Sequence, residues 1–228
     1  MPADAPRPAA LPPLPADALA RLQALAARPP AADGSRRVLL GLVGAPGAGK
    51  STLAAQLLRH LDRPAGRAQV VPMDGFHLAQ AELLRLGRAG RKGAPDTFDA
   101  HGYLALLRRL RAPRPGETVY APAFHREIEE PVAGEIAVAP EVEIVITEGN
   151  YLLLADGPWA EVAGLLDETW YVEVDDALRD ERLLARHRQF GRSAEAAREW
   201  VAATDAPNAL RIAAGRSRAD FIFRWPAP

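Results

Sequence analysis

The chain has 228 residues, of which 48% are hydrophobic and 25% charged, as is typical of one globular domain of ordinary size. Its 28 basic and 29 acidic residues give a formal net charge of -1, which provides no electrostatic reason to expect nucleic acid or an anionic membrane as a partner. The chain has no cysteine, so disulfides, thiolate metal sites and cysteine nucleophiles are excluded.

Residues 1–33 are expected to form a proline-rich flexible lead and one amphipathic helix. The lead has neither the basic start nor the continuous apolar run of a signal peptide. Leu19, Leu22 and Leu25 follow helical spacing and predict a packed helix over Asp17–Arg28. No apolar run in the chain reaches the roughly 18 to 20 residues that span a bilayer, so we expect a cytoplasmic protein.

From residue 34 onwards, apolar segments rich in β-branched residues alternate with amphipathic helices. Strands are expected at 37–44, 68–73, 117–124, 135–140, 141–148, 168–175 and 219–225. Helices are expected at 51–61, 78–87, 101–112, 176–190 and 194–203, with a basic loop at 88–99. This alternation predicts a single α/β domain over residues 34–228, with a parallel sheet covered by helices on both faces.

A glycine-rich loop with the pattern Gly-x-x-x-x-Gly-Lys-Ser lies between the first of these strands and the helix after it. Its residues are Gly44, Ala45, Pro46, Gly47, Ala48, Gly49, Lys50 and Ser51, followed by Thr52. Glycines let successive backbone N–H groups point at phosphate oxygens, and the helix N-terminus adds its dipole. We therefore expect nucleotide phosphates here, with Lys50 bridging the β- and γ-phosphates and Ser51 holding Mg²⁺.

Two other nucleotide-binding classes do not fit the sequence. A GTPase needs an Asn-Lys-x-Asp segment to read guanine, and the chain has none. Asp99 and Gly102 match the Asp-x-x-Gly pattern of GTPases, but they follow a polar loop where a strand should precede them. The Lys-Ser ending of the glycine-rich loop is wrong for a dinucleotide fingerprint.

Two apolar strands end in an acidic residue, Asp74 after "VVPM" and Glu148 after "EIVIT". The carboxyl ends of parallel strands line the ligand crevice. If both strands neighbour the strand before the phosphate loop, both carboxylates converge on the γ-phosphate. Hydrolysis needs only an oriented water, whereas transfer to an alcohol needs a carboxylate that accepts the hydroxyl proton. Two acids allow one for the metal and one for the base.

The order of the motifs resembles that of the phosphoribulokinase/uridine kinase family, which includes the bacterial type of pantothenate kinase. The motifs are "GAPGAGKST", "MDGFH", "RKGAPDTFD", "YAPAFHREIEEP", "ITEGNYLLL" and "RHRQFGRS". The chain looks most like the nucleoside/nucleotide-kinase-like branch of this family. The resemblance implies a P-loop three-layer α/β/α sandwich with a mostly parallel sheet and a helical lid. It also implies a Mg·ATP-dependent kinase in which Asp74 is the general base and Glu148 the Walker B acid.

The same resemblance gives a role to the arginines near the end of the helix at 176–190. Arg182 and Arg186 are four residues apart on one face, and Arg188 and Arg192 follow. Spacing alone favours a solvated basic face, whereas the resemblance implies a lid in which Arg186 and Arg192 close over the phosphates. Further along, Asp205 is expected to cap a turn.

The acceptor pocket is not determined by the sequence. Uridine kinase carries an aspartate for the ribose hydroxyls where this chain has Gly93 and Ala94, so a sugar, a nucleoside and a pantothenate-like acid all remain candidates. Tyr120 and Arg126 are candidate substrate contacts, with a solvated hairpin as the alternative. His77 either faces the acceptor or packs at the start of a helix.

The function expected from these residues is transfer of the γ-phosphoryl group of ATP to the hydroxyl of a small molecule, with Mg²⁺ as cofactor. The alternative is a regulatory P-loop ATPase coupled to a protein partner. No nucleic acid or membrane partner is expected. The resemblance is also consistent with a homodimer, because members of the family often dimerise.

Overall fold

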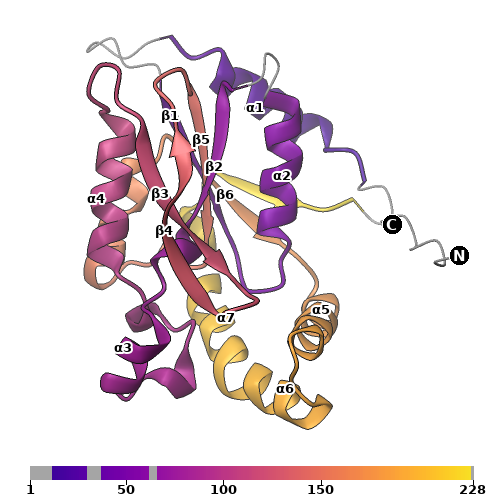
Figure 1. Cartoon of the computed structure of the whole chain (residues 1–228). Helices are drawn as coiled ribbons and strands as arrows, with labels where there is room; N and C mark the ends of the chain where they lie inside the picture. The colour runs from indigo at the N-terminus through magenta and orange to yellow at the C-terminus, as the bar shows by residue number, and fades with distance from the viewer. Residues whose placement is uncertain (1–11, 30–36, 62–65, 227–228) are drawn as a thin grey trace, which may run out of the picture.

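The computed structural model describes residues 12–29, 37–61 and 66–226. Of residues 1–33, for which a flexible lead and one helix were expected, residues 1–11 and 30–33 lie outside these ranges. The core of the described structure is a parallel sheet of five strands in the order β2-β5-β1-β6-β7 (Figure 1). The strands are β1 (Val38–Val43), β2 (Ala68–Pro72), β5 (Ile144–Gly149), β6 (Glu168–Glu173) and β7 (Phe221–Arg224).

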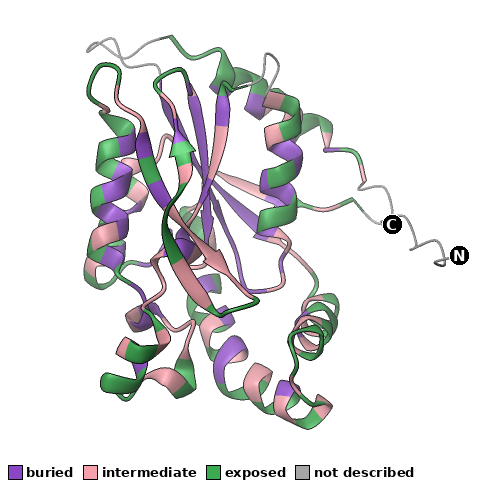
Figure 2. Ribbon diagram, in the orientation of Figure 1, coloured by how far each residue is buried: buried purple, intermediate pink, exposed green. Residues whose placement is uncertain are grey.

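Helices cover both faces of this sheet, which confirms the three-layer α/β/α architecture. Strand β1 is buried along its whole length, and its side chains alternate between the two faces. Leu40 and Leu42 belong to the cluster under α1 (Ala16–Ala26) and α2 (Lys50–Leu61), whereas Leu39 belongs to the cluster under α4 (Ala100–Arg111). Figure 2 shows the buried strands between helices whose outer faces are exposed.

Helix α1 packs on the same core as the rest of the chain. Its side chains Ala18, Leu22 and Leu25 are buried in the cluster that includes α2. Arg21 forms an ion pair of 2.6 Å with Glu168 of β6, which links the helix to the sheet. The predicted helical spacing of the leucines is therefore confirmed, because it places them on the buried face.

Two segments lie outside the main sheet. Strands β3 (Val119–His125) and β4 (Glu130–Val138) form an antiparallel hairpin in front of it in Figure 1. The lid consists of α5 (Asp176–Gln189), α6 (Ala194–Trp200) and α7 (Ala206–Ala213), which project beyond the carboxyl ends of the strands. The short helix α3 (Gln80–Arg85) follows β2.

Helix α7 is not among the expected helices, the last of which was placed at 194–203. The chain instead passes from α6 through one π-helical turn at Val201–Asp205 directly into α7. Pro207 lies in the first turn of α7, directly after the π-helical turn, and proline is tolerated in the first turn of a helix. Asp205 does not cap this helix with its side chain, contrary to expectation; its Oδ2 lies 2.8 Å from Nε2 of His187 in α5.

The Asp-x-x-Gly segment is a helix cap. The side chain of Asp99 accepts a hydrogen bond of 2.8 Å from the backbone N–H of Gly102 and so begins α4. A β-carbon on Gly102 would overlap this carboxylate. The segment therefore has a structural role, in agreement with its exclusion as a GTPase motif. Among the described residues, no helix is both long and apolar enough to cross a membrane.

Candidate active site

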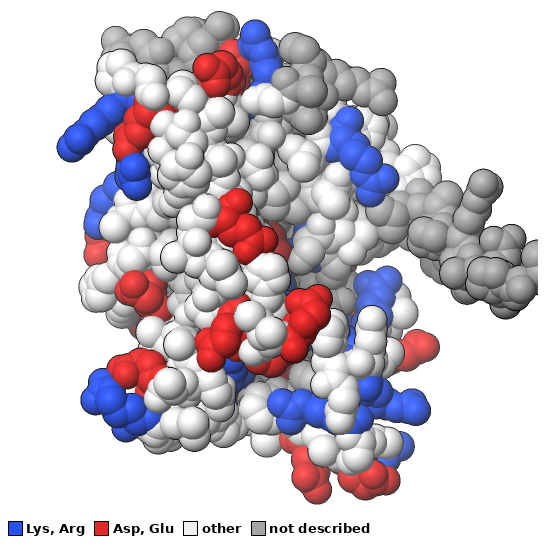
Figure 3. Space-filling model, in the orientation of Figure 1, with Lys and Arg blue, Asp and Glu red and all other residues white. Residues whose placement is uncertain are grey.

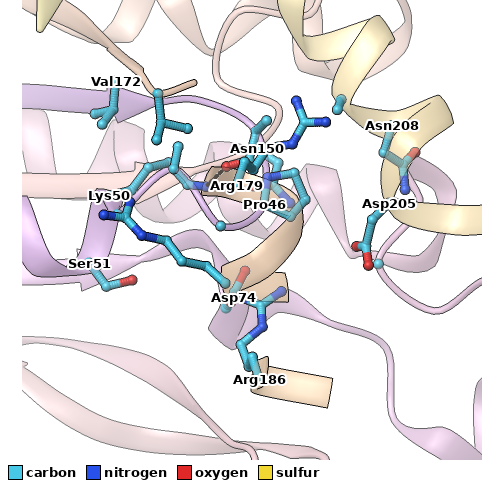
Figure 4. Close-up of a pocket in the computed structure, with 18 of the residues that line it drawn as sticks. Pro46, Lys50, Ser51, Asp74, Asn150, Val172, Arg179, Arg186, Asp205 and Asn208 are labelled. Atoms are coloured by element: carbon cyan, nitrogen blue, oxygen red, sulfur yellow. Dashed lines mark hydrogen bonds between the residues drawn. The ribbon is translucent and has the colours of Figure 1, made fainter. Parts of the chain in front are cut away.

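The phosphate loop lies between β1 and α2 and forms one wall of a cavity of about 1880 Å³ (Figure 4). Gly47 and Gly49 have φ angles of 82° and 89°, in the left-handed region that favours glycine. A β-carbon on Gly44 would lie 2.7 Å from the carbonyl oxygen of Val172, so glycine is also required where the loop passes β6. The loop conformation thus explains the glycines of the motif.

Lys50 extends back along the loop, and its ammonium group donates three hydrogen bonds. Nζ donates to the carbonyl oxygens of Gly44 at 2.9 Å and Ala45 at 3.1 Å, and to Oδ1 of Asn150 at 2.8 Å. Burial lowers the pKa of Lys50, while the nearby carboxylates of Glu148 and Asp74 oppose this shift. Sequence reasoning missed Asn150, although its place one residue after the end of β5 was a usable signal.

Glu148 and Ser51 form the polar pair that was expected for a metal. Ser51 Oγ donates a hydrogen bond of 2.7 Å to Oε1 of Glu148. Burial raises the pKa of the Glu148 carboxyl, and the charge of Lys50 opposes this. Within the described ranges no cluster of three or more His, Cys, Asp or Glu side chains is arranged for a metal ion. A hydroxyl and one carboxylate nevertheless suit Mg²⁺, which is commonly bound through few protein ligands together with water and substrate phosphates.

Asp74 reaches the cavity from a strand that does not touch β1. The strand β5 lies between them, so of the two strands that end in an acid only the strand of Glu148 neighbours the phosphate-loop strand. Pro72 is in register with Glu148, and the 3₁₀ turn Met73–Phe76 then carries Asp74 into the cavity lining. The carboxylate Oδ2 accepts a hydrogen bond of 3.2 Å from Nη2 of Arg126 on the β3–β4 hairpin.

Gly75 is required for the contact between this turn and the hairpin. A β-carbon at this position would overlap the backbone carbonyl of Pro122, which cannot rotate away as a side chain could. We therefore expect Gly75→Ala to lower the free energy of unfolding by about 1–3 kcal/mol, as for other overpacked sites. Gly90→Ala is the matched control, because a β-carbon there meets nothing within 4 Å. Equal stability of the two variants in urea denaturation would contradict this packing.

His77 lines the cavity, and its ring also contacts two aromatic rings and a backbone carbonyl. Its ring lies between those of Phe98 and Phe124, with centroid distances of 4.0 Å and 4.5 Å. Nδ1 lies 2.7 Å from the backbone carbonyl oxygen of Asp74 and must carry the hydrogen, because a carbonyl only accepts. Burial lowers the pKa of His77, which favours the neutral ring with Nε2 as an acceptor. His77 therefore both lines the cavity, as a residue that faces the acceptor would, and packs against its neighbours.

Several arginines of the lid line the cavity. Arg179, Arg182 and Arg186 lie on one face of α5 and reach the cavity with it. Arg179 was missed from sequence, although it is seven residues before Arg186; a β-carbon on Gly47 would lie 3.1 Å from its Cγ. Burial lowers the pKa of Arg186, and the positive charge of Arg126 lowers it further. Arg192 also lines the cavity, with its guanidinium 3.9 Å from the ring centroid of Trp200.

Tyr120 is the candidate substrate contact that the structure does not bring to the cavity, in line with the alternative of a solvated hairpin. It lies on β3 between the buried residues Val119 and Ala121, so strand alternation turns its ring to solvent, where it is 56% exposed. Arg126, six residues later, does line the cavity. Figure 4 also shows Asp205 and Asn208 on the side of the cavity away from Ser51.

The fold and the site define a P-loop kinase, in which a phosphate loop and strand-end acids face a helical lid across one cavity. A family model described as "Phosphoribulokinase / Uridine kinase family" matches residues 39–226, and the chain belongs to this family. The resemblance found in the sequence is therefore confirmed. The chain is a phosphotransferase with an alcohol group as acceptor, and membership of the family implies ATP as the donor and a small molecule as the acceptor.

Three relatives illustrate the similarity. A Schizosaccharomyces pombe protein named provisionally as a uridine kinase is 39% identical over 162 residues, which cover 68% of each chain. A pantothenate kinase of Limosilactobacillus reuteri is 30% identical over 151 residues, covering 65% of this chain and 48% of the relative. A crystal structure from Silicibacter sp. TM1040, named provisionally as a fructose transport system kinase, is 37% identical with a TM-score of 0.81, covering 90% of this chain and 97% of that one.

Proposed function

We propose that this protein transfers the γ-phosphoryl group of Mg·ATP to a hydroxyl of a small molecule, with Asp74 as the general base. The observation that carries this proposal is that the two strand-end carboxylates have different partners. Glu148 is hydrogen-bonded to Ser51 at the phosphate loop, whereas Asp74 lies on the side of the cavity lined by His77 and Arg126. One acid can therefore hold a metal while the other accepts a proton.

The donor half of the site would be formed by residues 44–52. Backbone N–H groups of the loop would contact the phosphates, and Lys50 would move from its carbonyl partners to the β- and γ-phosphate oxygens. Ser51 and Glu148 would hold Mg²⁺, which supplies charge neutralisation on those phosphates when bound. Arg186 and Arg192 of the lid would contact the transferring group from the other side of the cavity.

The chemical step follows from the position of Asp74. The acceptor hydroxyl gives its proton to the Asp74 carboxylate as its oxygen forms a bond to the γ-phosphorus. The bond between that phosphorus and the bridging oxygen breaks, and ADP leaves with the electron pair. His77 and Arg126 would contact the acceptor, which would be a sugar, a nucleoside or a pantothenate-like acid.

The test is an assay of ADP release with Mg·ATP in the presence of sugars, nucleosides and pantothenate, with mass spectrometry of the acceptor. The proposal predicts ADP release that depends on one of these acceptors and a product heavier by one phosphoryl group. ADP release that is the same with every acceptor and with none would instead support a regulatory ATPase. Omission of Mg²⁺ is expected to abolish turnover.

A further inference from the structure

Three cations from three separate elements face the part of the cavity beside Asp74. Arg126 comes from the β3–β4 hairpin, Arg186 from α5 and Lys92 from the loop before α4, and all three line the cavity. Lys92 lies 5.3 Å from the ring centroid of Phe124, and the guanidinium of Arg126 lies 5.9 Å from the same ring. The acceptor side of the cavity thus combines an aromatic wall with positive charge.

Among the described residues, no carboxylate lies within ion-pair distance of Arg186. The positive charge of Arg126 repels it, while Asp205, Asp74 and Glu129 attract it from farther away. Lys92 has Glu129 as a partner, through its carbonyl oxygen and through its carboxylate at 3.8 Å. Figure 3 shows that acidic side chains gather on the hairpin surface, but Glu127 points to solvent with 77% of its side chain exposed.

Arg126 holds the carboxylate that the proposed reaction needs. Its Nη2 donates to Oδ2 of Asp74 at 3.2 Å, while 40% of the Arg126 side chain remains exposed. The pair is therefore partly solvated, which makes its net stabilisation small and its exchange for another anion feasible. If Asp74 turns this oxygen to an acceptor hydroxyl, Arg126 loses its anionic partner.

The γ-phosphate would lie on the phosphate loop at Lys50, where the charges of Arg186 and Arg126 both act. Arg186 would contact it from the lid. Arg126 lies on the hairpin side, beside Phe124 and Asp74, where the acceptor would bind. A second anion on the acceptor itself would satisfy Arg126 at the moment when Asp74 is released.

We propose that the acceptor carries an anionic group, a carboxylate or a phosphate, that draws Arg126 away from Asp74 and so frees Oδ2 to accept the hydroxyl proton. This inference rests on the proposed function and makes Arg126 the residue that selects the acceptor. A neutral polyol or nucleoside would leave Arg126 paired with Asp74 and would be a poor substrate. A charge-assisted hydrogen bond between Arg126 and the acceptor corresponds to a preference of about 10- to 100-fold.

The test compares acceptors that differ in one anionic group: D-glycerate with glycerol, pantothenate with panthenol, and ribose 5-phosphate with ribose. For any pair that is phosphorylated, we expect kcat/KM to be at least about 10-fold higher for the anionic member. Arg126→Gln should bring this ratio close to one, and Arg126→Lys should retain part of it. Arg85→Gln is the matched control, because Arg85 pairs with Glu82 on an exposed helix at 2.6 Å and does not line the cavity.

A binding measurement decides the case in which none of the six acceptors is phosphorylated. Inorganic phosphate and malonate are titrated calorimetrically into protein saturated with a non-hydrolysable Mg·ATP analogue. Binding that Arg126→Gln abolishes and Arg85→Gln preserves supports the inference. No binding of either anion, or an anionic-to-neutral ratio that Arg126→Gln leaves unchanged, overturns it. ADP release without any acceptor dependence would count against the proposed function, while the titration would still decide whether Arg126 binds an anion.

Discussion

Asp74→Asn is expected to lower acceptor-dependent phosphoryl transfer by about 10²- to 10⁴-fold, the usual contribution of a general base. Asparagine keeps the size of the side chain and its hydrogen bond with Arg126, but it cannot take the hydroxyl proton. The measurement is kcat for ADP release with the best acceptor. Nucleotide binding should be retained, because Asp74 lies on the 3₁₀ turn after β2 and outside the phosphate loop.

The control for Asp74→Asn is Asp96→Asn. Asp96 is an exposed carboxylate that pairs with Arg91 at 2.6 Å, and it does not line the cavity. This variant should keep normal turnover. Normal turnover in Asp74→Asn itself would show that the hydroxyl proton leaves by another route.

Lys50→Met is expected to have the second large effect. Lys50 is one of only two lysines in the chain, and its ammonium group is the one that lies at the phosphate loop. Loss of a cation that stabilises the transferring phosphoryl group should lower kcat by about 10²- to 10³-fold, as for other preorganised donors. The stabilisation of the protein by Mg·ATP, measured as a rise in melting temperature, should also shrink.

The folded state should survive this substitution. Methionine is unbranched and adapts to the narrow space that Lys50 occupies, although Asn150 Oδ1 loses a donor. A circular dichroism spectrum like that of the wild type, together with the lost response to Mg·ATP, would assign the effect to the phosphate site. An unchanged response to Mg·ATP would contradict the role of Lys50.

Prediction of the site from sequence was most successful where backbone conformation or strand order places the residues. The phosphate loop is such a case, because its positive φ angles require glycine, and Gly47 and Gly49 stand at those positions in the sequence. The strand-end acids are another, because a parallel sheet brings the carboxyl ends of its strands to one edge. For this reason Glu148 and Asp74 could both be placed at the cavity, even though β2 is not the neighbour of β1.

Side-chain partners that come from distant elements were not predicted. Asn150 was missed because its contact with Lys50 joins residues 100 positions apart. Tyr120 was named as a candidate substrate contact, and Arg179 was not named as a site residue, for the same reason. The direction of a side chain depends on how the hairpin and the lid pack, and residue type alone does not predict it. The continuation of the lid through a π-helical turn into α7 was also not predicted.

The sequence by itself thus determined the α/β sandwich and the phosphate loop, because these follow from local spacing, glycine conformations and strand ends; the order of its motifs carried the resemblance to the family. Only the tertiary structure decided that Arg126 is paired with Asp74, that His77 is held between two aromatic rings, and that Tyr120 faces solvent. The physical reason is that these contacts join the hairpin, the turn after β2 and the loop before α4, and their geometry is set by packing between elements. In the proposed function, Arg126 and His77 of this second set would contact the acceptor.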